Sequence, residues 1–124
     1  MAPSNEESNT PAELVGSWAL IAVDGNPGDM GDVTPTLDLR RDGSIGGFSG
    51  VNRFVTRLGS EDAVEGTMSL GPTAGTRMAG PPRAMAFEKI FLERLDAVTG
   101  YDVDGDTLRL WSGDDEVLTF ERQA

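Results

Sequence analysis

Four polar residues in two short segments are the candidates for a binding site. Asn52 and Arg53 follow a glycine-rich stretch, and Thr76 and Arg77 come further along the chain. Side chains of these four types can donate or accept hydrogen bonds. One interpretation is therefore a polar recognition site beside the glycine-rich bend. The structural alternative is that Asn52 bonds to loop backbone and that Arg53 pairs with a carboxylate.

Catalytic chemistry is limited by what the chain lacks. Its 124 residues include no Cys and no His. This excludes thiol nucleophiles, disulfides, imidazole acid–base chemistry and zinc sites of the usual ligand types. A pair of carboxylates is the one catalytic arrangement left open, because its members can lie far apart in the chain. We therefore expect no enzymatic activity, no cofactor and no metal site.

A run of aspartates, Asp102-x-Asp104-Gly105-Asp106, is the nearest approach to a calcium-binding loop. Its glycine stands at the fourth position instead of the sixth, and Gly113 takes the place of the closing Glu. A hairpin turn explains the run better.

The charge balance restricts the partners. The chain carries 21 acidic and 10 basic residues, for a net charge of -11. Such a charge repels nucleic acid and anionic lipid surfaces at long range. It fits a soluble protein, or one with a cationic partner. The longest apolar stretch, Trp18–Val23, is far shorter than the roughly 20 residues of a membrane span, so another protein is the expected partner.

The elements that must position these residues are mostly short strands. Asp42-Gly43 and Asp104-Gly105 are favoured two-residue hairpin turns, and the glycines around Phe48 indicate a bend or a close approach of backbone. The first strand is expected to be buried on both faces or to lie at the mouth of a curved sheet. The expected strands cover residues 14–23, 36–41, 45 onward, 54–58, 64–70, 101–103, 107–111 and 116–121.

One amphipathic helix is predicted over about residues 82–98, after Pro81-Pro82, and Gly100 would end it. Its apolar stripe, with Ile90 beside it, is Ala84, Phe87, Phe91, Leu95 and Val98. No strand–helix–strand alternation supports a parallel sheet. The expected fold is mainly β (α+β): a small curved antiparallel sheet or partly open β-barrel of seven or eight strands, with the helix packed across it. Residues 1–13 are expected to be a disordered tail and 14–122 a single, monomeric domain.

A set of short motifs carries a family resemblance. Over roughly residues 14–121 the chain resembles the META/HslJ-like domain family. The motifs, in order, are Gly16-Ser17-Trp18, Ser49-Gly50-Val51-Asn52-Arg53-Phe54, Thr76-Arg77-Met78-Ala79-Gly80 and, after the helix, Leu108-Arg109-Leu110.

The resemblance implies a barrel-like sheet with a helix across it and a non-catalytic accessory role. Members are typically exported or envelope-associated, often lipid-anchored, and are linked to heat-shock response, antibiotic resistance, secretion and virulence. The fold is also similar to that of a type III secretion pilot lipoprotein, which by analogy favours binding of a protein partner. If Met1 is not the natural start, the family favours export to the envelope; otherwise a cytoplasmic location is expected.

The chain departs from the family at two positions together. Many members carry Cys where Val51 and Gly80 stand. The joint loss implies that the two positions are neighbours, with Cα atoms within about 7 Å. A redox role of the family is therefore not transferable to this chain.

An alternative function is a carrier of a small apolar ligand or lipid, held in a cavity between helix and sheet. Its candidate lining residues are Phe48, Phe87, Phe91 and Trp111, which would otherwise be core residues. A connected internal cavity of a few hundred Å³ would favour the carrier. A densely filled interior would favour the binding of a protein partner.

Overall fold

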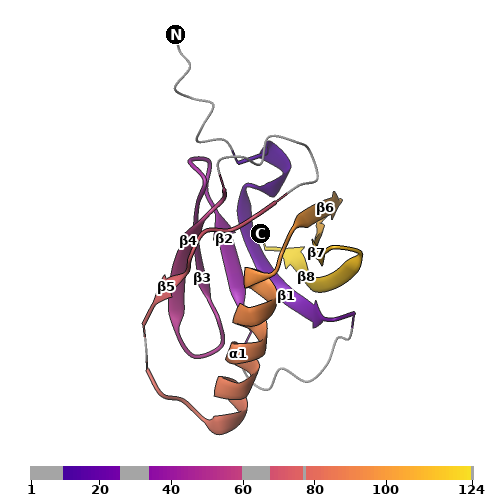
Figure 1. Ribbon diagram of the computed structural model, residues 1–124. Coiled ribbons are helices and arrows are strands. Elements are labelled where there is room, and N and C mark those ends of the chain that lie inside the picture. The colour runs from indigo at the N-terminus through magenta and orange to yellow at the C-terminus, as the bar shows by residue number, and fades with distance from the viewer. Residues whose placement is uncertain (1–9, 26–33, 60–67, 77, 124) are drawn as a thin grey trace.

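The computed structural model describes residues 10–25, 34–59, 68–76 and 78–123. In these ranges eight strands form one antiparallel sheet in the order β5-β4-β3-β2-β1-β8-β7-β6, with one helix, α1 (Pro82–Asp96), against it (Figure 1). The predicted mainly β (α+β) fold is confirmed. The strands are β1 (Gly16–Val23), β2 (Thr36–Leu39), β3 (Ser44–Phe48), β4 (Arg53–Arg57), β5 (Ala74–Gly75), β6 (Gly100–Asp104), β7 (Thr107–Ser112) and β8 (Asp115–Arg122).

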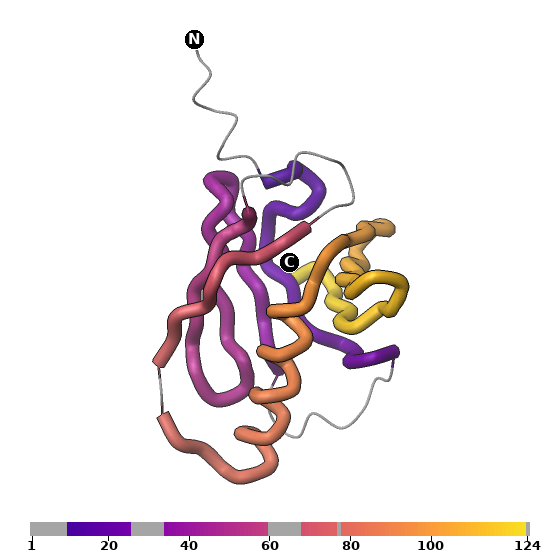
Figure 2. The backbone as a smooth tube through the Cα atoms, in the orientation of Figure 1, coloured from indigo at the N-terminus to yellow at the C-terminus, as the bar shows by residue number. Residues whose placement is uncertain are grey.

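The sheet curls around α1 without closing (Figures 1 and 2). Its first and last strands, β1 and β8, pair at its centre, and β5 and β6 are its two edges. The segment before β5 draws these edges together at one end. In this segment Leu70 forms an antiparallel β-bridge with Leu58, which directly follows β4. The Met68 amide donates a hydrogen bond to the carbonyl of Thr99, which directly precedes β6, at 3.0 Å. Beyond this contact, α1 lies beside the open part of the barrel.

The core fills the concave side of the sheet. Trp18 of β1 pairs with Leu37 of β2, and both are buried. The helix adds Phe91, whose ring centroid lies 6.2 Å from that of Phe54 and 6.3 Å from that of Phe120, in edge-on contacts. Burial of these aromatic and aliphatic side chains holds the helix against both halves of the sheet.

Two adjacent glycines in β3 face opposite sides of the sheet. A Cβ at Gly47 would lie 2.5 Å from the Phe54 ring and 2.5 Å from the Thr36 carbonyl oxygen. The expected close approach is therefore real, because the ring of Phe54 occupies the space that a side chain at Gly47 would need. A Cβ at Gly46 would meet only the mobile end of Arg40, at 3.0 Å.

We expect Gly47→Ala to lower the free energy of unfolding by about 1–3 kcal/mol, because Phe54 and the β2 backbone must both move. Gly46→Ala is the matched control and should change it by no more than about 0.5 kcal/mol. Urea denaturation of the two variants measures the difference. Equal stabilities would show that the Phe54 contact is not tight.

The helix differs from its prediction at both its end and its stripe. It ends at Asp96 with Ala97 as its C-cap, so Val98 lies beyond it, and Gly100 opens β6 instead of capping the helix. Ile90 is 40% exposed. The helical spacing predicted a position beside the apolar stripe. The concave face of the sheet is too narrow to cover the whole apolar surface of the helix, so Ile90 remains in solvent.

Three further expectations are adjusted at the N-terminal strand and the loops. The first strand begins at Gly16, and it is buried mainly through Trp18 and Leu20 on one face. A bulge then leaves Ile21 38% exposed. The stretch 71–82, read as loop, contains β5. Most of the strand expected over 64–70 lies outside the described residues.

The tail predicted over residues 1–13 is described only from Thr10. That residue is buried, and its amide donates to the Arg41 carbonyl at 3.2 Å. Residues Ala12–Leu14 form a short 3-10 helix. The predicted disorder therefore does not extend to Thr10 or to the 3-10 helix.

The aspartate run forms a hairpin turn, as predicted. Asp104 pairs with Thr107 across the turn between β6 and β7, and Gly105 has a φ of 64°. Among the described residues no cluster of acidic side chains could hold a metal ion. No helix in the same part of the chain has the length and apolar character needed to cross a membrane.

Candidate functional site

A buried carboxylate joins the helix to the glycine-rich bend. Glu88 of α1 is 8% exposed, and its carboxylate accepts hydrogen bonds from the Ser49 hydroxyl at 2.5 Å and the Asn52 amide at 2.8 Å. The Val51 amide adds a longer contact at 3.3 Å. Gly50 permits the bend that presents these donors to Glu88, because its φ of 120° lies in a region that other residues rarely adopt. A Cβ there would make only an ordinary contact, 3.8 Å from the Cβ of Glu88.

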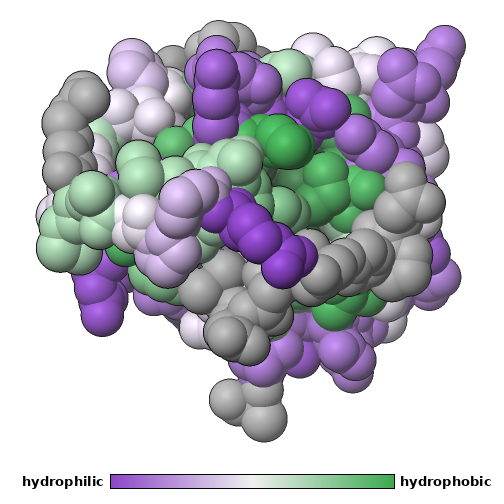
Figure 3. All heavy atoms as spheres, turned by 90° about the horizontal axis from the view of Figure 1, so that it is seen from below, coloured by the Kyte–Doolittle hydropathy of each residue, from purple (hydrophilic) through white to green (hydrophobic). Residues whose placement is uncertain are grey.

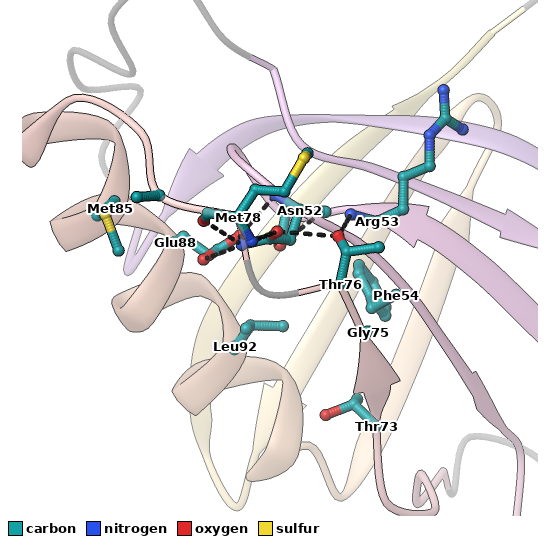
Figure 4. Close-up of a pocket in the computed structure, with 12 residues that line it drawn as sticks. Asn52, Arg53, Phe54, Thr73, Gly75, Thr76, Met78, Met85, Glu88 and Leu92 are labelled. Carbon is teal, nitrogen blue, oxygen red and sulfur yellow. Dashed lines mark hydrogen bonds between the residues drawn. The ribbon is translucent and has the colours of Figure 1, made fainter.

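Asn52 joins the two motif segments. Its side-chain oxygen accepts from the Met78 amide at 2.6 Å and from the Thr76 hydroxyl at 2.8 Å. Its side-chain nitrogen donates to the Met78 carbonyl at 3.2 Å and to Glu88 at 3.2 Å. Figure 4 shows this network between α1 and the segment that follows β5. The structural alternative for Asn52, bonding to loop backbone, is therefore realised.

The network keeps Glu88 ionised. Burial alone raises the pKa of Glu88, but the hydrogen bonds from the Ser49 hydroxyl and from the amide and side chain of Asn52 outweigh it. Together with the Val51 amide, they leave the pKa below its ordinary value. Each of these donors favours the charged carboxylate.

This pKa shift predicts a pH dependence of stability. Because the pKa of Glu88 is lower in the folded state, its contribution is complete above the unfolded value of about 4.3 and is lost as pH falls through the folded pKa. The free energy of unfolding should therefore fall more steeply below about pH 5 in the wild type than in Glu88→Gln. Urea denaturation at a series of pH values tests this. Parallel curves for the two proteins would contradict it.

A pocket opens beside this network. It has a volume of about 370 Å³ and lies between α1, the β4 end of the sheet and β5. Both methionines that line it are exposed, Met78 by 59% and Met85 by 41%, so the pocket faces solvent. Seen from the end at which α1 begins, hydrophobic side chains reach the surface between hydrophilic ones (Figure 3). The lining residues are Ser49, Asn52, Arg53, Phe54, Thr73, Gly75, Thr76, Met78, Ala79, Met85, Glu88 and Leu92.

The structure brings some of the predicted site residues together and separates others. Asn52, Arg53 and Thr76 line the pocket, whereas Phe48 and Trp111 are not among its lining residues. Arg77 lies outside the described residues.

The guanidinium of Arg53 points away from the polar network (Figure 4). Arg53 pairs with Phe48 across β3 and β4, so both side chains lie on the outer face of the sheet. No described residue forms an ion pair with Arg53. The carboxylate partner suggested for Arg53 is therefore not seen in the described ranges.

The apolar wall of the pocket was not identified from the sequence. Phe91 is a fully buried core residue and Phe87 is partly buried against the core, whereas Met85, Leu92 and Phe54 face the pocket. Glu88 was also missed. A signal for Glu88 was present, because it follows Ala84 by four residues and precedes Phe91 by three, so that it falls within the apolar stripe.

Val51 and Gly80 are neighbours, as expected. A Cβ built at Gly80 lies 3.6 Å from the Cβ of Val51 and 3.0 Å from one of its methyl carbons. The two Cα atoms are therefore within the roughly 7 Å that a disulfide spans. The side chain of Val51 fills the space between the two segments.

The fold and site define a small mainly β domain with one helix in the open side of a curved sheet and a solvent-facing pocket next to it. The chain belongs to the META domain family, whose model matches residues 12–124. The predicted family is thus confirmed.

Solved structures with the same fold include a Burkholderia xenovorans protein determined by NMR, 25% identical, with a TM-score of 0.66 over 98% of this chain and 87% of that one. A second NMR structure is 22% identical, with a TM-score of 0.66 over 91% and 95% of the two chains. A duf4847 family protein from Bacteroides vulgatus is 17% identical, with a TM-score of 0.55 over 73% and 61%. The search of curated proteins found no significant match.

Proposed function

We propose that this protein is a non-catalytic accessory domain that binds a protein partner through the pocket between α1 and β5. Stress response or cell-envelope and secretion processes are the setting that the family favours. The observation that carries this proposal is a pocket that opens to solvent beside a filled core. Its rim carries Met78 and Met85, and the flexible thioether side chain of methionine adapts to the surface of a partner.

The helix offers a matched pair of variants to test this proposal. Met85 and Ile90 are 41% and 40% exposed, but only Met85 lines the pocket. A charge at position 85 would be desolvated by a bound partner, so Met85→Glu should weaken binding about tenfold or more. Ile90→Glu should leave binding unchanged.

Affinity capture from the source cells with the wild type and both variants provides the measurement. We expect the wild type and Ile90→Glu to capture the same partner protein, and we expect Met85→Glu to fail to capture it. If the two variants captured the same set of proteins, the pocket would have no part in partner binding.

A carrier of a small apolar ligand is the second candidate. The volume of about 370 Å³ lies within the usual range for small-molecule sites, and Phe54, Met85 and Leu92 supply apolar surface. Exposure at the rim favours the protein partner, because ligand carriers bury most of the ligand surface. Titration with a medium-chain fatty acid, followed by NMR, discriminates the two. Saturable shifts at Leu92 and Phe54 would favour the carrier.

A further inference from the structure

The outer edge of β5 has backbone groups available for pairing. The Thr76 amide donates to the Arg53 carbonyl at 3.0 Å, and Phe54 pairs with Gly75 in the same register. Because peptide groups alternate in direction along an antiparallel strand, the N–H and C=O of Gly75 point away from β4. Outside the ladder with β4, no described residue forms a hydrogen bond with either group.

The two edges of the sheet differ in charge. The β6 edge carries Asp102 and Asp104, and charged side chains hinder the addition of a further strand. The segment Gly71–Thr76, which runs along β4, contains no charged residue. Its residues from Pro72 onward are exposed. The edge without charge is the one that borders the pocket.

The pocket lies where the side chains of an added strand would point. Thr73, Gly75 and Thr76 form one wall, and Met85 and Leu92 of α1 form another. In an added strand alternate side chains face the same side. Those facing inward would therefore contact Leu92, Met85 and the Phe54 ring between the two walls.

We propose that residues 73–76, here called the β5 edge, bind an extended segment of the partner protein as an additional antiparallel or parallel strand, with its alternate apolar side chains in the pocket. This inference rests on the proposed function and specifies its mode of recognition. Main-chain hydrogen bonds supply affinity in such complexes, and the pocket supplies selectivity.

The charge of the chain specifies the segment further. With a net charge of -11, the protein repels acidic segments at long range and attracts basic ones. Two charged residues also line the pocket: Glu88, whose hydrogen bonds keep it ionised, and Arg53, whose guanidinium points away from the polar network (Figure 4). The bound segment is therefore apolar on its inward side and neutral or basic on its outward side.

Synthetic peptides of ten residues can test this mode directly. The probe alternates Leu and Val on one side with Lys and Thr on the other. Two derivatives carry N-methyl groups, one on alternate amides and one on the remaining amides, so that only one of them loses the donors that face the β5 edge. A fourth peptide has Glu in place of Lys. Binding is followed by backbone amide shifts in NMR titrations of the wild type, Met85→Glu and Ile90→Glu.

We expect the derivative methylated on the amides that face the β5 edge to bind about tenfold more weakly than the other, because it cannot donate a hydrogen bond to the Gly75 carbonyl and leaves that carbonyl without a partner. The amides of Thr73 and Gly75 should shift, the Glu peptide should bind more weakly, and Met85→Glu but not Ile90→Glu should reduce affinity. Equal binding of the two derivatives, with shifts at Leu92 and Met85 alone, would overturn strand addition and leave the proposed function intact. Shifts at neither the edge nor the pocket with any peptide would overturn strand addition, and the capture experiment would then decide the proposed function separately.

Discussion

Glu88→Ala is expected to lower the free energy of unfolding by about 3 kcal/mol. The carboxylate is buried and accepts hydrogen bonds from Ser49 and Asn52. Alanine would leave the buried Asn52 amide without its acceptor and the Ser49 hydroxyl with only the Asn52 carbonyl, at 2.9 Å. It would also disconnect α1 from the glycine-rich bend. Urea denaturation at neutral pH measures the loss.

Two controls separate this network from a general effect on the helix. Glu93, also on α1, is exposed, and Glu93→Ala should change stability by no more than about 0.5 kcal/mol. Glu88→Gln keeps one acceptor oxygen but loses the charge, so its loss should be intermediate. If Glu88→Ala proved as stable as Glu93→Ala, the network would contribute nothing to stability.

A disulfide introduced at positions 51 and 80 should stabilise the protein by roughly 3–4 kcal/mol, the value expected for closing a loop of this length. The built Cβ of Gly80 lies 3.6 Å from the Cβ of Val51, close to the disulfide average of about 3.8 Å. Gly80 is not among the glycines with positive φ, so a cysteine there is not strained by its backbone. The variant is Val51→Cys with Gly80→Cys.

The measurement compares thermal unfolding of the oxidised and reduced double variant, with thiol titration to confirm that the bond has formed. The single variants serve as controls, since neither can form an intramolecular bond in a chain that has no other Cys. Free thiols that persist under oxidising conditions would refute the arrangement of the two segments.

Local patterns predicted most of the fold. The Asp42-Gly43 and Asp104-Gly105 signals locate two hairpins correctly, although the loops themselves are residues 41–43 and 105–106 instead of the two dipeptides. Residues such as Phe91 and Leu95 recur at helical spacing. These signals act between residues close in the chain, so a sequence shows them directly. The short β5 has no such signal, because its pairing depends on β4 and on the close fit of Gly75 to that strand.

The candidate site was predictable only in part. The resemblance identified Asn52 and Thr76, which the structure places in one network. The role of Glu88 depends on a contact across 36 residues of sequence, and an acidic residue on a helix ordinarily faces water. For Arg53 the error is the reverse, because a residue predicted to belong to the polar site has its charged group outside it. Its neighbour Asn52 points into the site, and the alternation of side chains along β4 sends its own guanidinium outward.

The pairing of β1 with β8 at the centre of the sheet has a consequence for how the polypeptide reaches its native state. Trp18 pairs with Arg122, so the middle of the sheet joins residues from nearly opposite ends of the sequence. Contacts of such long range make folding slow, because a large loop must close before they form. During synthesis, β1 therefore has no partner for one of its two hydrogen-bonding edges until β8 has left the ribosome, although β2 can already pair with the other edge.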